Sequence, residues 1–264
     1  MKKVVGILLI FFVTIALHAQ DSAVVLEKVT GTELGIDPNR NLYLVSGSKL
    51  SKLDGEGRLL RSFDDSFLGD IASIDVDNPM KIMVFYRESG KILFLDDRLS
   101  PVTEPLDLFS HGYTSVSLAA YSTDNLIWLY DAAAHELICI DFYCKEKSRN
   151  RLNFSDFEPT QLLARYERSL LMNNPEDGMY LFDAFGTFLK RIPIQVESIL
   201  TYTKSFVMYL TQDSVGTYDL LRMEDSRTAR PAGAGAMIVL GPKMYYLDKE
   251  HRLNIYDPKM DTVR

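Results

Sequence analysis

Residues 36–57 read IDPNRNLYLVSGSKLSKLDGEG, and this stretch decides the fold. It opens on the turn-forming run Asp-Pro-Asn, which precedes an apolar strand over 42–45. A polar turn follows, and a second strand then ends at Asp54. Turn formers this close together leave room only for short strands joined as hairpins. The stretch therefore predicts antiparallel β-structure.

A strand that ends in aspartate recurs along the chain. The recurring residues are Asp54, Asp96, Asp141, Asp183 and Asp257. Their spacings are 42, 45, 42 and 74 residues, and Asp219 falls near the middle of the longest interval. A period of roughly 40 residues, repeated six times, is typical of propeller blades.

Each unit has the same plan: a short strand, a strongly apolar strand, the strand that ends in aspartate, and a more polar fourth strand. The apolar second strands are expected over 42–45, 82–86, 126–130, 169–172, 206–210 and 244–247. This gradient fits inner strands packed between neighbouring blades and an outermost strand in water. Residues 161–171 show some helical spacing, but their place in the repeat predicts an inner strand.

The predicted fold is all-β: a six-bladed β-propeller of four-stranded antiparallel blades. The last unit holds three strands over 237–256, so we expect the N-terminal strand at 23–29 to complete the last blade and close the ring. Each recurring aspartate is expected to accept backbone N–H groups in the turn to the fourth strand. The alternative is a ring of metal-binding or catalytic carboxylates.

The N-terminus has the pattern of an export signal. Lys2 and Lys3 precede an uncharged, largely apolar run over 4–17, which is too short to span the ~30 Å hydrocarbon core. We expect a signal peptide over 1–19 and a single propeller domain over 20–264. The mature protein is then periplasmic or secreted, with the outer membrane as one destination. The alternative is an uncleaved N-terminal anchor.

The 264 residues are 47% hydrophobic and 25% charged, with a formal net charge of −7, which excludes a disordered chain. Two of the 29 basic residues leave with the signal, so the mature chain carries 27 against 36 acidic residues, a net charge of −9. This balance disfavours nucleic acid as a partner. Cys139 and Cys144 are expected to be unbonded, because five residues apart along one strand they would lie on opposite faces and too far apart; the alternative is a turn between them, which permits a disulfide.

The first unit, over 36–57, resembles an NHL-type repeat, in which a DPxGNxYV turn and strand precede IxxFDxxG. The match is partial around 181–186. The resemblance implies a six-bladed propeller, and this fold family includes binding scaffolds, sensors and enzymes. Propeller lactonases, which are similar, hold Ca²⁺ in the central channel with Glu, Asn and Asp. Asp75 is the best inner-strand carboxylate here, and no such cluster falls on matching positions.

Sequence motifs for catalysis are absent. Neither GxSxG nor HExxH occurs, and His111, His135 and His251 fall in separate loops. Trp128 lies in an apolar strand and is assigned to the core. We therefore expect no catalysis and no cofactor, and an exported scaffold that binds a protein or a ligand in the cell envelope. The alternative is a metal-dependent hydrolase or lyase with a site at the central channel, for which Ca²⁺ is the candidate ion.

Acidic residues concentrate in the turns between second and third strands and in the connections between blades, which share one face of a propeller. The acids are Asp64, Asp65, Asp70, Glu88, Asp131, Glu136, Asp156, Glu158, Glu176, Asp177, Glu197, Asp213, Asp248 and Glu250. The candidate interaction face comprises Glu88, Asp131, Glu176, Asp213, Asp248, Phe109 and Tyr113. It suits an envelope protein or a small cationic ligand. The alternative is a solvated rim that keeps the protein soluble.

Overall fold

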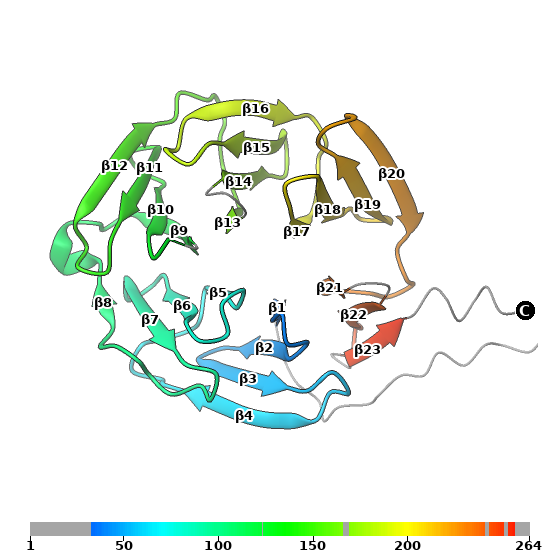
Figure 1. The fold of residues 1–264 in the computed structure, drawn as a ribbon, viewed down its shortest axis with the longest axis horizontal. Coiled ribbons are helices and arrows are strands. Elements are labelled where there is room, and N and C mark those ends of the chain that lie inside the picture. The colour runs from blue at the N-terminus through cyan, green and yellow to red at the C-terminus, as the bar shows by residue number, and fades with distance from the viewer. Residues whose placement is uncertain (1–32, 123, 166–168, 241–242, 251–252, 257–264) are drawn as a thin grey trace, which may run out of the picture.

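The protein forms a ring of six antiparallel sheets around a central channel (Figure 1). The computed structural model describes residues 33–122, 124–165, 169–240, 243–250 and 253–256. The inner strands β1, β5, β9, β13, β17 and β21 surround the centre, and β4, β12, β16 and β20 lie at the periphery (Figure 1). The six-bladed propeller predicted from the repeat is confirmed.

The blades follow one another along the chain. Blade 1 comprises β1 (Glu33–Ile36), β2 (Leu42–Ser46), β3 (Lys49–Leu53) and β4 (Leu59–Asp64), and blade 2 comprises β5 (Ser73–Asp75), β6 (Ile82–Tyr86), β7 (Lys91–Leu95) and β8 (Leu106–Asp107). Blade 3 comprises β9 (Val116–Tyr121), β10 (Ile127–Asp131), β11 (Glu136–Ile140) and β12 (Glu146–Arg151), and blade 4 comprises β13 (Gln161–Arg165), β14 (Ser169–Asn174), β15 (Gly178–Phe182) and β16 (Phe188–Ile192). Blade 5 comprises β17 (Ser198–Tyr202), β18 (Phe206–Leu210), β19 (Ser214–Asp219) and β20 (Glu224–Ala229), and blade 6 comprises β21 (Met237–Leu240), β22 (Lys243–Leu247) and β23 (Leu253–Tyr256).

The described elements follow the repeat predicted from the sequence. Residues 161–165 form the inner strand β13 and residues 169–171 begin β14, so the described residues of this stretch are strands, as the repeat predicts, and the part of the chain that the structure describes contains no α-helix. Its one short helical turn is the 3₁₀ helix η1 (Phe109–His111). No described helix is long and apolar enough to cross a membrane. The predicted signal peptide over 1–19 and the predicted closing strand over 23–29 lie outside the described residues.

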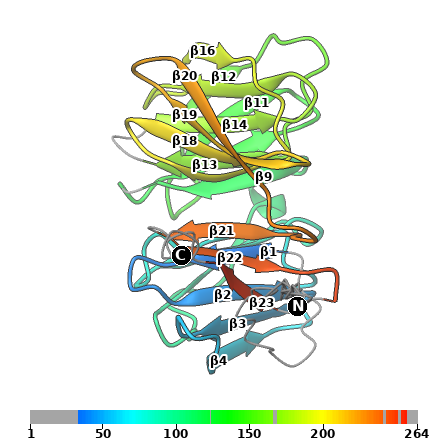
Figure 2. The same cartoon turned by 90° about the vertical axis from the view of Figure 1, so that its right-hand side faces the viewer.

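Burial falls from the inside of each blade to its edge. Every residue of β6 is buried, whereas every residue of β20 is exposed. Apolar side chains of neighbouring blades form a core at each of the six blade interfaces, and Trp128, at 1% exposure, lies in the core between blades 3 and 4. Blade 6 packs against blade 1 through residues such as Tyr245 and Leu44, so that the two ends of the described chain meet in the ring (Figure 2).

The recurring aspartates act as turn caps, as predicted. Oδ1 of each accepts two backbone N–H groups, from the residues two and four positions later, at 2.8–3.0 Å; the four residues are Asp54, Asp96, Asp141 and Asp183. Asp219 also accepts two backbone N–H groups, but from the residues two and three positions later, Leu221 and Arg222. Asp257 lies outside the described residues. These carboxylates therefore hold hairpins rather than line the channel.

The two cysteines are free thiols, so the prediction that they are unbonded is confirmed. Cys139 lies on β11, and Cys144 lies in the turn to β12 at a φ of 55°. Both side chains are buried, and burial raises the pKa of the Cys139 thiol to about 12. Neither thiol is poised as a nucleophile.

Candidate functional site

The antiparallel order of every blade gives the ring two different faces. One face is built from the turns between second and third strands and from the connections between blades, and we call it the acidic face. The opposite face is built from the turns between first and second strands and between third and fourth strands. The candidate acids predicted from the sequence therefore lie on one side of the ring.

Some acids of this face are neutralised by arginine. Glu136 pairs with Arg149, Asp177 pairs with Arg191, and Glu197 pairs with Arg230 at 2.7 Å. The Tyr180 hydroxyl and the Arg191 guanidinium both hold the pKa of Asp177 below its usual range. Exposed pairs of this kind contribute little to stability, about 0–1 kcal/mol. These three acids are unavailable to a partner without loss of an existing contact.

Three of the candidate acids stabilise their own turns. Asp131 accepts the N–H groups of Ala133 and Ala134, both at 3.0 Å. Asp248 accepts the N–H of Glu250 at 3.0 Å. The third, Asp213, accepts the Thr211 hydroxyl at 2.9 Å in the β18–β19 turn. These acids have a structural task, and their substitution perturbs the turn as well as the charge.

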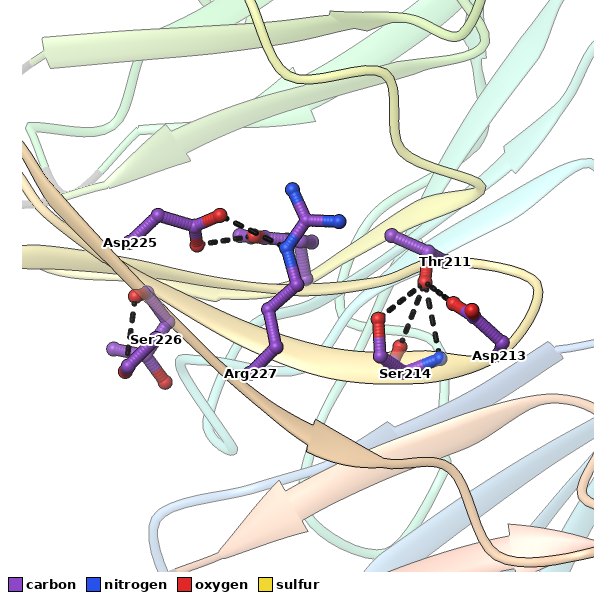
Figure 3. Close-up of polar contacts among 8 residues, drawn as sticks. Thr211, Asp213, Ser214, Asp225, Ser226 and Arg227 are labelled. Carbon is purple, nitrogen blue, oxygen red and sulfur yellow. Dashed lines mark hydrogen bonds and ion pairs between the residues drawn. The ribbon is translucent and has the colours of Figure 1, made fainter.

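The turn at Asp213 shows how blade 5 builds this surface (Figure 3). The Thr211 hydroxyl contacts the carboxylate of Asp213 and the hydroxyl of Ser214, and it accepts the Ser214 N–H at 3.0 Å. The Thr211 hydroxyl is the main cause of the lowered pKa of Asp213. On the outer strand nearby, Arg227 Nε donates to Asp225 at 2.9 Å (Figure 3). The contacts of Thr211 therefore hold the Asp213 carboxylate in a fixed position within its turn.

The remaining acids carry the negative charge of the face. Asp70, Glu88, Asp156, Glu158 and Glu176 are exposed, and none of them forms an ion pair with a described residue. They come from the β4–β5 connection, the β6–β7 turn, the β12–β13 connection and the β14–β15 turn. Charge without a counter-ion therefore extends over blades 1 to 4.

The aromatic part of the predicted face is corrected by the structure. Tyr113 is only 7% exposed and packs in the core between blades 2 and 3, so it is not a surface residue. Its hydroxyl reaches the carbonyl oxygen of Cys144 at 3.4 Å. Phe109 is partly covered, because one side of its ring lies over Gly90, and the side chain is 42% exposed. Phe67, which follows β4, is 97% exposed.

The channel at the centre of the ring is a second candidate site. Its cavity of about 450 Å³ is lined by all six inner strands. Asp75, the carboxylate predicted from the sequence, lies on β5 and lines it. Sequence reasoning missed Glu33 on β1, whose Oε1 accepts the Ile74 N–H at 3.5 Å. Desolvation raises the pKa of Glu33 to about 8, and the charge of Asp75 adds to the shift.

The channel carries polar groups that join blades. Gln161 on β13 bridges to β17: its Oε1 accepts the Ile199 N–H at 2.6 Å, and its Nε2 donates to the Ile199 carbonyl at 3.4 Å. At the mouth, Arg87 Nε donates to the Ser117 carbonyl of blade 3 at 2.9 Å. These contacts fix the geometry of the lining.

Neither of the two histidines that the structure describes lines the channel. His111 lies in η1, where Nδ1 contacts the Asp107 carbonyl at 2.9 Å. His135 lies in the β10–β11 turn, where Nδ1 contacts the Tyr130 hydroxyl at 3.2 Å. His251 lies outside the described residues. Among the residues that the structure describes, no three His, Cys, Asp or Glu side chains gather as metal ligands do.

Comparison with known proteins shows the fold. No protein-family model matches the sequence, and no curated protein matches it. Among solved structures, a streptogramin B lyase is similar at a TM-score of 0.60 and 11% identity, over 90% of this chain and 86% of that chain.

Two further structures are similar. The WD40 domain of Neurospora crassa Pan2 has a TM-score of 0.60 and 10% identity, over 87% of this chain and 76% of that chain. The BBS1N structure in complex with ARL6DN has a TM-score of 0.56 and 16% identity, over 81% of this chain and 74% of that chain. Identities this low carry the likeness of fold and no more, and on that likeness the chain is a six-bladed β-propeller with structural neighbours of propeller type.

Proposed function

We propose that this protein is an exported, NHL-type β-propeller that acts as a binding scaffold in the cell envelope, and that its acidic face receives a basic protein. One observation carries the proposal: Asp70, Glu88, Glu158 and Glu176 project negative charge from one face without an ion pair to a described residue. Complementary charge accelerates association and selects the partner. Exposed Phe67 supplies an apolar contact within the same face.

The rigidity of the ring supports a scaffold function. Side chains of one blade bond to the backbone of the next, as Lys52 Nζ does with the Asp97 carbonyl at 2.7 Å and Asn150 Nδ2 with the Phe185 carbonyl at 2.7 Å. A surface held in this way loses little entropy when it binds. A propeller of similar fold, BBS1N, is solved in complex with ARL6DN.

The test is charge reversal on the acidic face. We choose Glu88→Lys, Glu158→Lys and Glu176→Lys together, because these side chains cap no turn. The matched control, Asp97→Lys, Glu104→Lys and Glu224→Lys, makes the same change of net charge at exposed positions of the opposite face or the outer strand. Each tagged protein is cross-linked in its native cells and purified. The proposal expects a partner with wild type and control, and its loss with the acidic-face variant; retention by that variant refutes it.

Export has its own test. The proposal predicts that the protein recovered from cells begins at Gln20, which mass spectrometry of the N-terminal peptide measures directly. A recovered chain that still begins at Met1 contradicts cleavage. Recovery of that uncleaved chain in the membrane fraction identifies residues 1–19 as an anchor.

A hydrolase or lyase site in the channel is the second candidate function. It is favoured by one observation, the half-buried Glu33 beside Asp75, with its pKa raised to about 8. A ligand that binds only the native state raises the melting temperature. The test is the melting temperature with Ca²⁺ and with a chelator, for wild type and for Glu33→Gln. Stabilisation by Ca²⁺ in wild type but not in the variant supports the channel site, and a wild-type melting temperature that is the same with Ca²⁺ and with chelator excludes a Ca²⁺ site that uses Glu33.

A further inference from the structure

The central channel is lined by more acids than bases. Its cavity of about 450 Å³ lies among the six inner strands (Figure 1). Of the ionisable residues in the lining, three are acids, Glu33, Asp75 and Asp77, and one is a base, Arg87. Arg87 donates from Nε to the Ser117 carbonyl at 2.9 Å and forms no ion pair with a described residue. The charge of the lining therefore favours a cation over an anion.

Apolar side chains contribute to the same lining. Five of the inner strands each supply a half-buried apolar residue, and each of these residues is only partly covered by the core beside it: Ile36, Ile74, Leu163, Leu200 and Val239. No aromatic residue lines the cavity in the part of the chain that the structure describes. The walls therefore suit an aliphatic chain rather than a stacked ring.

Glu33 is the acid with the greatest capacity for a ligand. Its Oε1 accepts the Ile74 N–H at 3.5 Å, a long contact that leaves the carboxyl group free for a stronger donor. Glu33 forms no ion pair with a described residue. Desolvation raises the pKa of Glu33 to about 8, and the charge of Asp75 adds to the shift. Glu33 is thus a half-buried acid close to a second acid, without a cation of its own.

We propose that the channel binds a protonated amine with an aliphatic tail, whose ammonium group lies between Glu33 and Asp75 and whose tail contacts the apolar residues of the inner strands. A volume of about 450 Å³ falls within the ~300–1,000 Å³ of small-molecule sites. No three His, Cys, Asp or Glu side chains of the described residues gather as metal ligands do, so the acids suit an organic cation. Sites for quaternary ammonium ions use aromatic rings, whereas carboxyl groups suit an ammonium that donates N–H bonds.

Binding is expected to release a proton. Because the pKa of Glu33 is about 8, its neutral acid predominates at pH 7. An ammonium group beside Glu33 favours the carboxylate, so the acid and the free ammonium give a carboxylate–ammonium pair and one proton passes to the buffer. The affinity should therefore rise about tenfold per pH unit below pH 7 and become constant above about pH 8. The other ionisable residues that line the cavity are Asp75, Asp77 and Arg87.

This inference goes beyond the proposed scaffold function. It uses the channel of the second candidate function but requires neither Ca²⁺ nor a reaction, and it does not involve the acidic face. Its failure therefore leaves partner capture by the acidic face untouched, and a Ca²⁺ site is tested separately by the melting temperature.

The experiment is isothermal titration calorimetry of the protein recovered from its native cells, with chelator present throughout. The probe is hexylammonium. Two further compounds share its chain: 1-hexanol has no charge, and hexyltrimethylammonium has the charge without an N–H donor. The variant is Glu33→Gln, which keeps an oxygen that can accept the Ile74 N–H but cannot ionise. The matched control is Glu158→Gln, the same change at an exposed acid outside the channel lining.

Wild type and control are expected to bind hexylammonium at pH 7 with release of about one proton, measured as the difference in binding heat between phosphate and HEPES buffers. Both other compounds should bind wild type at least about tenfold more weakly, since one hydrogen bond to a charged group supplies about that factor. Glu33→Gln should lose at least about tenfold in affinity for hexylammonium and release no proton. Equal melting temperatures show that the three proteins are folded.

Three results overturn the proposal. The first is the absence of hexylammonium binding to wild type up to about 10 mM. The second is binding of 1-hexanol as tight as that of hexylammonium, because the channel is then an apolar cavity and no cation site. The third is undiminished affinity and proton release in folded Glu33→Gln, because another group then holds the ammonium. If Glu33→Gln does not fold, the three compounds and the proton release of wild type decide the matter by themselves.

Discussion

The substitution Asp96→Ala tests whether the recurring aspartates hold the blades together. Asp96 Oδ1 accepts the Arg98 N–H at 2.9 Å and the Ser100 N–H at 2.8 Å. The next residue, Asp97, is exposed, and its carboxylate accepts no hydrogen bond from a described residue. Asp97→Ala therefore makes the same change of charge in the same turn without removal of a cap.

The expected loss follows from those two bonds. A cap of this kind contributes about 0.5–2 kcal/mol, because its two donors are partly satisfied by water when the carboxylate is gone. We expect Asp96→Ala to lower the free energy of unfolding by about 1–2 kcal/mol, which corresponds to roughly 2–8 °C in melting temperature for a domain of this size. Asp97→Ala is expected to stay within about 0.5 kcal/mol of wild type.

Urea denaturation at neutral pH measures both variants. The midpoint should fall for Asp96→Ala while the m-value stays constant, since the surface exposed on unfolding is unchanged. Equal losses of stability in the two variants would contradict this expectation, because the loss would then come from charge and not from the cap. A large fall with Asp97→Ala alone is equally contrary to it.

Three further predictions concern packing and titration. In blade 5, a Cβ at Gly216 falls 2.1 Å from Cζ of Tyr209, so Gly216→Ala should destabilise the protein by about 1–3 kcal/mol in urea, and Tyr209→Leu in the same chain should recover part of the loss. Because the folded state keeps Glu33 protonated up to a pKa of about 8, against 4.5 for an ordinary glutamate, the free energy of unfolding should fall as the pH rises through that interval, and Glu33→Gln should remove this contribution in pH-dependent melts. The thiols of Cys139 and Cys144 should resist an aromatic disulfide reagent in the native protein and react at once in urea; fast reaction without urea contradicts their burial.

The fold could be predicted from sequence because each level of the chain agrees with the next. The aspartate that ends a strand also caps the following hairpin, so one residue marks both the period and the turn. Short apolar strands such as β6 are buried on both faces. A propeller requires this, because its inner strands lie between two neighbouring blades, whereas a sheet with one face in water does not. Period, turn chemistry and burial therefore pointed to the same architecture.

Surface residues were predicted less well, because a sequence does not show which aromatic side chains turn inward. Tyr113 and Phe157 both lie in connections between blades, yet both are buried, at 7% and 2% exposure. Loops of a propeller cover the ends of the cores between blades, so their apolar residues fold under the surface. Tyr143 and Phe185 point outward from hairpins whose backbone is fixed by a cap, and no periodicity marks that difference.

The channel carboxylate Glu33 escaped prediction for a topological reason. It lies on β1 (Glu33–Ile36), whereas the first repeat unit was predicted to begin at residue 36, so no inner strand was expected at Glu33. Its partner Asp75 was identified because β5 precedes a clear turn. The positions of the inner strands around the channel depend on how the six blades close into a ring, and that closure involves the whole chain.

Binding of a basic protein by the acidic face is measured by partner capture with three proteins from the same cells. They are wild type, the acidic-face variant with Glu88, Glu158 and Glu176 changed to lysine, and the control with Asp97, Glu104 and Glu224 changed to lysine. The quantity measured is the amount of cross-linked partner per mole of propeller, with equal melting temperatures as the condition. Wild type and control are expected to capture the same partner in equal amount, and the acidic-face variant is expected to lose it. Equal capture by all three proteins contradicts the acidic face as the binding surface.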